Sequence, residues 1–240
     1  MKQKPKIVVV GSGIIGASIA LSCLNLGAEL LVLERDKLGG AASSNSFGWI
    51  NASFAESPAY FDLRNAAVDT FRNLKTELNL KDSVSWQGTL WWEESGQELK
   101  KQFNDLLERG YSAKLLNSNE IKNLEPNLKD VPEAAIFTPL EGAAEADRVA
   151  LAMLRKLTDE GGKVISGCAV EGLKFKKDRV SGVQTNIGEM SCDMVVLATG
   201  AAAEKGLLGC EWQLPMQNKK GLIVKTSPVS HIIKHVLMTN

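Results

Sequence analysis

The first 34 residues carry the pattern that most constrains what this chain can fold into. A short run of β-branched residues over 7–10 is followed by Gly11-Ser12-Gly13-Ile14-Ile15-Gly16, which fits the pattern G-x-G-x-x-G. Apolar residues over 14–26 are typical of a helix, and a second apolar run over 30–33 is typical of a buried strand and ends at Glu34. A strand, a glycine turn, a helix and a strand within about 30 residues predict a βαβ unit and hence a parallel sheet.

The three glycines and the acid suit one kind of ligand. The first glycine permits a tight turn, the second lets the backbone approach a pyrophosphate, and the third lets the helix pack closely on the sheet. Free amides at the start of the helix favour phosphate charge. Glu34 lies 18 residues beyond Gly16, where a carboxylate accepts hydrogen bonds from a ribose diol and repels the extra phosphate of NADP. We therefore expect a dinucleotide site, and a glycine-rich turn without a ligand is the alternative.

The next segment bears on which dinucleotide binds. A simple NAD dehydrogenase would ordinarily enter its next βα unit after Glu34, but residues 39–49 read GGAASSNSFGW. These small side chains, hydroxyls and glycines suit close backbone contact with a large, extended ligand. Taken alone, the same residues also fit an ordinary polar surface loop, and Trp49 fits an ordinary core aromatic.

Composition excludes several classes of function. Since 28 Lys and Arg residues balance 28 Asp and Glu residues, no basic excess is available to displace counterions from a phosphate backbone, and no nucleic-acid partner is expected. The hydrophobic share of 44% and the charged share of 23% are those of a globular protein and argue against intrinsic disorder.

The cysteines and the apolar runs give further expectations. Cysteines at 23, 168, 192 and 210 show neither CxxC nor metal-ligand spacing, which favours reduced thiols. His231 and His235 could share a helix face, but no third ligand is evident, so surface or interface histidines are favoured and no metal is expected. The N-terminal apolar run is broken by glycines, and no other run is long enough to span a membrane. We expect a cytoplasmic protein, with peripheral membrane contact left open.

Later residues predict a mixed region and then a return to sheet. The expected helices cover 58–78, 98–109, 118–124 (capped by Ser118) and 147–160 (capped by Asp147), and the expected strands cover 85–93, 163–165, 169–175, 179–185, 193–198 and 220–225. Trp86, Trp91 and Trp92 either line a pocket or pack in a core, and the last two point to opposite faces of a strand. This order predicts a discontinuous first domain with a second domain inserted into it.

Four segments together resemble FAD-dependent oxidoreductases of the D-amino-acid oxidase type, which include glycine oxidase, sarcosine oxidase and D-amino-acid dehydrogenase. They are the glycine fingerprint, Glu34-Arg35, the loop over 39–49, and Val195-Val196-Leu197-Ala198-Thr199-Gly200. The resemblance implies an α/β fold: a discontinuous Rossmann-like FAD-binding domain over 1–82 and 143–205, with an inserted, mostly antiparallel α+β substrate domain over 83–142 and 206–240. It implies oxidation of the C–N bond of a D-amino acid, glycine or N-methyl glycine by hydride transfer to flavin N5.

The resemblance also implies which residues contact FAD. It assigns Gly11, Ser12, Gly13, Ile14, Ile15 and Gly16 to the pyrophosphate, Glu34 to the adenosine ribose, Arg35 and the backbone of Val170 to the adenine end, Ala42, Ser43, Ser44 and Asn45 to the diphosphate and ribityl chain, Gly48 and Trp49 to the isoalloxazine, and Ala198, Thr199 and Gly200 to a cover over the cofactor. Because residues 39–53 contain no histidine, the histidine linkage of some subfamilies is not available there, and FAD is expected to bind non-covalently.

The sequence leaves the catalytic residues unknown. Family members continue beyond the position of Asn240 with further substrate sheet, a last FAD-contacting loop and groups that hold a substrate carboxylate. Two functions therefore stay open: an amine or amino-acid oxidoreductase, and a non-catalytic FAD-binding fragment or subunit that needs a partner chain or a C-terminal segment. A third, an NAD-dependent dehydrogenase, is disfavoured by residues 39–49 and 198–200.

Overall fold

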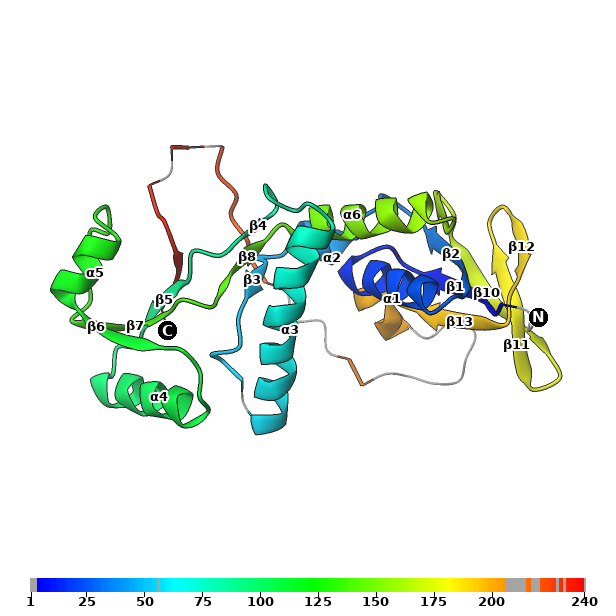
Figure 1. The fold of residues 1–240 in the computed structure, drawn as a ribbon. Coiled ribbons are helices and arrows are strands. Elements are labelled where there is room, and N and C mark those ends of the chain that lie inside the picture. The colour runs from blue at the N-terminus through cyan, green and yellow to red at the C-terminus, as the bar shows by residue number, and fades with distance from the viewer. Residues whose placement is uncertain are drawn as a thin grey trace. The chain divides into compact units, whose positions relative to one another are not determined.

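The chain folds into two compact units, which are described separately. The computed structural model describes residues 4–55, 57–205, 215–216, 221–227, 229–230 and 232–239. The first unit takes Met1–Ser46 and Glu145–Ile223, and the second takes Phe47–Ala144 and Val224–Asn240 (Figure 1). The division thus parts the chain between residues 46 and 47, whereas the expected FAD-binding domain extended to residue 82. That domain assignment concerns function and stays a prediction.

The first unit is built on a parallel sheet. Its strands are β1 (Lys6–Val10), β2 (Glu29–Glu34), β9 (Lys163–Ser166) and β13 (Met194–Leu197), in the order β13-β1-β2-β9. All three pairs are parallel, and Val8 lies opposite Leu31 on one side and Val195 on the other. Strands of a parallel sheet are covered on both faces, which is why they read as continuous apolar runs. The predicted βαβ unit and the α/β class are confirmed.

Helices cover one face of this sheet and a second, smaller sheet covers the other. Helices α1 (Ile14–Asn25) and α6 (Ala146–Asp159) contact each other, and α1 contacts β1 and β2. On the opposite face, β10 (Val170–Lys176), β11 (Arg179–Thr185) and β12 (Gly188–Ser191) form an antiparallel sheet. Its Val183 packs with Val8, Val10 and Leu33 in one cluster. The expected strands over 169–175 and 179–185 pair with each other as β10 and β11, whereas β12, which is poor in β-branched residues, was not predicted.

Two cysteines lie inside the same cluster. Cys168 and Cys192 are buried and unpaired, and burial raises the pKa of the Cys192 thiol. Among the described residues Cys23 is also a free thiol, while Cys210 lies outside them. Buried thiols in an apolar cluster pack as small hydrophobic groups.

The described residues of the second unit form two small sheets and three helices. One sheet has the order β14-β5-β7-β6 and the other β3-β8-β4. The strands are β3 (Trp49–Ile50), β4 (Val84–Ser85), β5 (Thr89–Trp92), β6 (Lys114–Asn117), β7 (Ala134–Thr138), β8 (Gly142–Ala144) and β14 (Val236–Thr239), and the helices are α3 (Pro58–Glu77), α4 (Gly96–Glu108) and α5 (Ser118–Leu124). Strand β14 pairs with β5 in parallel, and the other pairs of both sheets are antiparallel.

Opposite faces of the larger sheet bury different clusters. Trp91 is 1% exposed and packs with Phe61, Leu99 and Ile136, whereas Trp92 packs on the cluster around Leu90. The expectation that these tryptophans face opposite ways, with at least one in a core, is confirmed. Trp86 lies instead under the guanidinium of Arg72, 4.7 Å from its ring centroid.

Several element boundaries differ from those expected. The strand expected over 85–93 is two strands, because Gly88 adopts φ +85° between them. The loop over 39–53 contains helix α2 (Ala41–Ser44) as well as β3. Asn117 rather than Ser118 caps α5, since its side chain accepts from the amides of residues 119 and 120. Helix α6 begins at Ala146, one residue before the expected cap, and residues 221–225 are not a strand.

In the described ranges, no helix has both the length and the apolar character that crossing a membrane requires.

Candidate functional site

The glycine turn of the first unit lies between β1 and α1. Gly11 adopts φ +105°, and a Cβ placed there would lie 2.4 Å from the carbonyl oxygen of Ala198. A Cβ on Gly16 would lie 2.0 Å from the carbonyl oxygen of Gly11. Real side chains do not tolerate such distances, so both positions require glycine. The turn therefore brings Gly11, Gly16 and Ala198 together.

The start of α1 lacks a side-chain cap from its own N-cap residue. Gly13 is the N-cap residue and provides no side-chain cap, and the amide of Ile14 donates to Ser43 Oγ over 3.1 Å. Gly40, with φ +76°, approaches so closely that its Cβ would lie 2.6 Å from Gly13 Cα. The partial positive charge at a helix start favours a phosphate. Gly40 was not among the predicted contacts, although two consecutive glycines at 39–40 are a visible signal of such an approach.

Glu34 is held in a defined orientation at the end of β2. Its Oε2 accepts from the amide of Ser12 (2.9 Å) and from the hydroxyl of Ser12 (2.8 Å), and its Oε1 accepts from the amide of Asp36 (3.0 Å). The fully buried Ser12 hydroxyl also accepts from the amide of Gly39 over 3.2 Å. A carboxylate has about four acceptor positions, so Oε1 retains capacity for a further donor such as a ribose hydroxyl.

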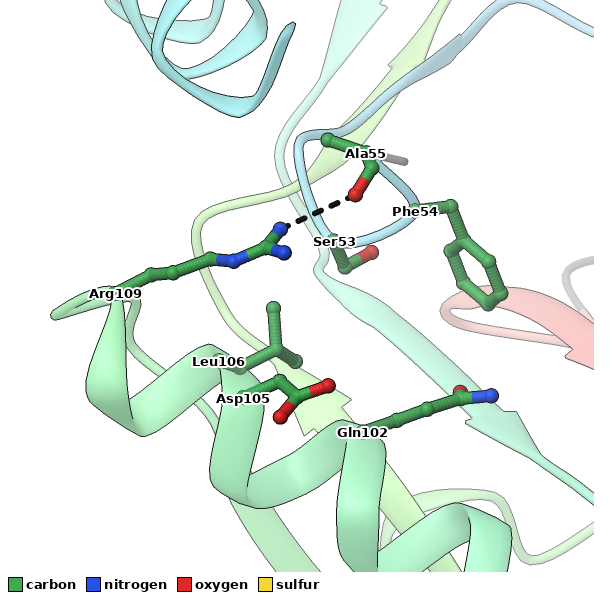
Figure 2. A pocket seen from close by; sticks show the side chains of 7 residues that line it. All are labelled: Ser53, Phe54, Ala55, Gln102, Asp105, Leu106 and Arg109. Atoms are coloured by element: carbon green, nitrogen blue, oxygen red, sulfur yellow. Dashed lines mark hydrogen bonds between the residues drawn. The ribbon is translucent and has the colours of Figure 1, made fainter. Parts of the chain in front are cut away.

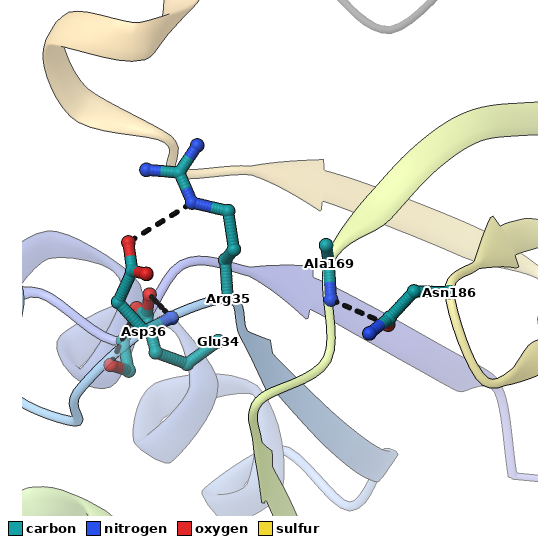
Figure 3. A network of polar contacts seen from close by, with 6 residues as sticks. Glu34, Arg35, Asp36, Ala169 and Asn186 are labelled. Carbon is teal, nitrogen blue, oxygen red and sulfur yellow. Dashed lines mark hydrogen bonds and ion pairs between the residues drawn. The ribbon is translucent and has the colours of Figure 1, made fainter.

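Figure 3 shows Glu34 with Arg35, which is expected at the adenine end, and also Ala169, the residue before Val170. The amide of Cys168 donates to the carbonyl oxygen of Glu34 over 2.9 Å, which ties the end of β9 to the end of β2. The amide of Ala169, just before Val170, donates to Asn186 Oδ1 over 2.9 Å. Arg35 forms an exposed ion pair with Asp36 over 3.0 Å. Arg35 thus directly follows Glu34 in the chain, and Val170 lies two residues after Cys168, whose amide bonds to Glu34.

The other predicted contacts of the first unit lie in α1, in or next to α2, and after β13. In α2 the Asn45 side chain and the Ser44 hydroxyl both donate to the carbonyl oxygen of Ala41, so these two polar side chains bond locally. Ala42 lies in the same helix. Ile15 is 65% exposed. Thr199 and Gly200, with φ +57° at Gly200, follow the end of β13.

Gly48 and Trp49, in contrast, belong to the second unit. Gly48 adopts φ +70°, and a Cβ there would lie 1.9 Å from the carbonyl oxygen of Ala144. The indole N–H of Trp49 donates to Thr89 Oγ1 over 2.8 Å and to Glu141 Oε2 over 3.2 Å. The structure therefore fixes both the backbone and the side chain at this position within the second unit.

Glu141 is a buried carboxylate that sequence reasoning missed. It is 0% exposed, and its Oε1 accepts from the amides of Ala52 (3.2 Å) and Ser53 (3.1 Å) and from the hydroxyl of Tyr111 (3.2 Å). Burial, followed by the nearby Glu141 charge, raises the pKa of Tyr111 well above its ordinary value. A single glutamate before Gly142 carries no local signal of burial, so only the fold reveals it.

A pocket of about 230 Å³ lies between residues 53–55 and α4 (Figure 2). Ser53, Phe54, Ala55, Gln102, Asp105, Leu106 and Arg109 line it. Figure 2 shows Arg109 extending to the carbonyl oxygen of Ala55, which it contacts over 3.1 Å. The pocket is smaller than the sites of about 300–1,000 Å³ that bind drug-sized ligands, and it contains none of the residues predicted to contact FAD.

The histidine pair has only one described member. His235 is not on a helix, and its Nδ1 lies 2.7 Å from Oε1 of the buried Glu125. Its side chain is 12% exposed, so the favoured interpretation of a surface histidine is wrong for this residue. His231 lies outside the described residues, and those residues contain no group of three or more His, Cys, Asp and Glu side chains that could hold a metal.

Comparison with known proteins gives a consistent result. A family model described as FAD dependent oxidoreductase matches residues 6–239. Sarcosine oxidase subunit beta from Rhodobacter capsulatus is 23% identical over 253 residues, which cover 100% of this chain and 60% of that protein.

Solved structures show the same fold. L-proline dehydrogenase from P. horikoshii has a TM-score of 0.83 at 24% identity, covering 100% of this chain and 65% of that one. Glycine oxidase from Bacillus cereus has a TM-score of 0.77 at 22% identity, covering 84% of this chain and 57% of that one. The chain therefore spans less than two thirds of the length of each of these three relatives.

Proposed function

Because the chain belongs to the FAD dependent oxidoreductase family, we propose that it is the FAD-binding part of an enzyme that oxidises the C–N bond of a small amino acid or secondary amine. The family predicted from residues 7–50 and 193–200 is thereby confirmed, and the activity is the proposal. The names of three relatives support the substrate class, since sarcosine, glycine and L-proline are all small amino acids. Glycine, D-amino acids and N-methyl glycine are the substrates to test first.

The observation that carries the proposal is the glycine turn together with the start of α1 and the carboxylate of Glu34. Gly11 and Gly16 leave no room for a Cβ, Gly13 starts α1 without a side-chain cap, and Glu34 keeps acceptor capacity beside them. This is a cradle in which backbone amides meet a pyrophosphate and a carboxylate meets a ribose. The residues present therefore fit FAD.

The remaining contacts follow from the same assignment. We propose that Arg35 and the Val170 backbone hold the adenine end, that residues 42–45 follow the diphosphate and ribityl chain, and that residues 198–200 cover the cofactor. We place Gly48 and Trp49 near the isoalloxazine. Bound flavin would supply a hydride acceptor, and the residues of this chain bind and orient it. We assign no catalytic residue.

The experiment is a visible absorption spectrum of the purified chain, before and after acid precipitation. Flavin bands that pass into the supernatant would support non-covalent FAD. Flavin retained in the pellet would contradict non-covalent binding, and a folded but colourless protein would contradict the FAD proposal. Calorimetry with NAD then tests the dehydrogenase alternative.

Gly13→Ala sharpens this experiment. The backbone of Gly13 has φ −65°, and an alanine methyl would meet Ser43 Oγ at 3.4 Å, so the variant should fold. The same methyl occupies the space through which a pyrophosphate approaches the second glycine. We expect folded protein with little bound flavin, whereas the control Gly96→Ala, where nothing lies within 4 Å of the added Cβ, should keep it.

Anaerobic mixing with candidate amines tests the activity itself. Bleaching of the flavin bands by glycine, sarcosine, a D-amino acid or L-proline would support the proposed reaction. Bound FAD that no amine bleaches would contradict activity of this chain alone. Since one relative is named as an enzyme subunit, bleaching that appears only with an added partner chain would then identify this chain as a subunit.

A further inference from the structure

We propose that Glu141 is a positioning residue that holds residues 47–55, hereafter the 47–55 segment, in one conformation. The inference rests on the proposed function, which places Gly48 and Trp49 of this segment beside the flavin ring. We assign no flavin contact to Glu141 itself, which acts through this segment. Three of its hydrogen bonds reach the segment, a fourth joins it to Tyr111, and all four lie within the second unit.

The partners of Glu141 are all groups that can donate a hydrogen bond. They are the indole N–H of Trp49, the amides of Ala52 and Ser53, and the hydroxyl of Tyr111. The indole and the two amides can only donate, and the Tyr111 hydroxyl donates to the same oxygen as the amides. The two carboxyl oxygens of Glu141 accept from all four groups at once.

The carbonyl groups of the same segment are held by cations. Arg64 donates through Nε to the carbonyl oxygen of Asn51 and through Nη1 to that of Phe54, each over 3.0 Å, and through Nη2 to the Asn51 side chain. Arg109 donates to the carbonyl oxygen of Ala55 over 3.1 Å. One buried acid thus takes the N–H groups of the segment while two arginines take its carbonyl groups. A change in the backbone path would therefore break hydrogen bonds to the acid and hydrogen bonds to the arginines at the same time.

The position of Glu141 in the chain makes its effect on Trp49 direct. It immediately precedes β8, and Trp49 pairs with Ala143 of that strand. The backbone of Trp49 is therefore set by β8, and the orientation of its side chain is set by the carboxylate just before β8 together with Thr89. The indole also packs edge-on against Phe54, 5.3 Å between ring centroids. Backbone and side chain are both fixed by residues about 90 positions away.

Glu141→Gln in the full chain tests the inference, because glutamine keeps the shape but turns one acceptor into a donor. Without FAD, we expect amide hydrogen exchange over 47–55 to become about tenfold faster, as loss of a bond to a charged group predicts. With FAD, we expect the visible circular dichroism of the bound flavin to change. A purely structural role would leave the flavin signal unchanged.

Glu125→Gln is the matched control. Glu125 is also a fully buried glutamate of the second unit, and its Oε1 accepts from the amides of Lys234 and His235, each over 2.8 Å. None of these bonds involves the 47–55 segment. We expect this variant to lose stability and to keep both the exchange of 47–55 and the flavin signal of the unaltered chain.

Each outcome decides between the possibilities. Unchanged exchange over 47–55 in Glu141→Gln would overturn the inference, and so would faster exchange with an unchanged flavin signal. Absence of FAD from the unaltered chain would overturn the proposed function and with it the role at a flavin. If Glu141→Gln does not fold, Tyr111→Phe removes one of the four donors and should give a smaller change of both signals in the same direction. No change in that variant would likewise overturn the inference.

Discussion

The two units fix their loops by opposite means. The turn over 11–16 takes its shape from missing side chains, since a Cβ on Gly16 would lie 2.0 Å from the Gly11 carbonyl oxygen. The 47–55 segment also contains a glycine without room for a Cβ, Gly48, but most of its length is held by charged side chains elsewhere, with Glu141 on N–H groups and Arg64 and Arg109 on carbonyl groups. The glycine turn is thus fixed by close steric contacts, whereas the 47–55 segment depends on hydrogen bonds between its backbone and charged side chains that are distant in sequence.

The largest effect is expected from a substitution in the glycine turn. Gly16→Ala places a methyl 2.0 Å from the Gly11 carbonyl oxygen and 3.2 Å from Ala198 Cβ, and neither neighbour can move without shifting the backbone. We expect a loss of about 3 kcal/mol in the free energy of unfolding, the upper range for overpacking, together with loss of bound flavin. Denaturant unfolding followed by circular dichroism measures the first. Gly96→Ala is the control, and equal stability of the two variants would contradict the steric argument.

Arg64→Met tests the long-range charged contacts that hold the 47–55 segment. This change leaves the carbonyl oxygens of Asn51 and Phe54 without their guanidinium donor and removes the cation over the Tyr60 ring. We expect a loss of about 2 kcal/mol in the free energy of unfolding. Arg155→Met, at an exposed position on α6, should stay close to the unaltered chain in the same denaturant titration.

Combining Arg64→Met with Glu141→Gln then asks whether acid and arginine act as one unit. Residues that share a network show coupling in a double-mutant cycle. We expect the combined loss to be smaller than the sum of the two single losses, because the first change already frees the segment. Strict additivity would mean that the two groups hold the segment independently.

The same contrast explains how much the sequence could predict. The glycine turn, the helix after it and the strand that ends at Glu34 were all predicted, because the residues that determine them lie within one βαβ unit. Ser12 shows the limit of that reasoning, because its type does not reveal that its hydroxyl bridges Glu34 and Gly39.

Long-range pairing left no signal along the chain. Trp49 and Glu141 are 92 positions apart, and the amide of His235 donates to a carboxylate 110 positions away. Strand β14 pairs with β5 across a still longer separation, with Val236 opposite Thr89, so the end of the chain gave no hint that it forms a strand. At shorter range, Asn117 and Ser118 are both good N-cap residues, and only the geometry selects Asn117.

An alkaline titration gives a smaller effect that reports on burial of the Glu141 network. The pKa of Tyr111 is raised above its ordinary value of 10.0 by burial and then by the Glu141 charge. The unfolded chain therefore releases this proton above pH 10 while the folded chain retains it, so the stability that Tyr111 contributes below pH 10 is lost as pH rises. We expect an extra slope of about 1.4 kcal/mol per pH unit in the unfolding free energy. Tyr111→Phe should remove that slope, and an identical slope in both proteins would contradict it.

The smallest effect is expected at an ion pair that belongs to neither network. Arg35 and Asp36 lie 3.0 Å apart, but both side chains are 69% exposed, so solvent screens the pair and holding it costs side-chain entropy. We expect Asp36→Asn to change the free energy of unfolding by no more than about 0.5 kcal/mol, measured by denaturant unfolding at low and high salt. Because the Asp36 amide still donates to Glu34 after this change, flavin binding should also persist. A large loss of flavin would show instead that the charge of Asp36 holds Arg35 in place at the adenine end, and the proposed contact of Arg35 would then depend on a charged partner as the 47–55 segment does.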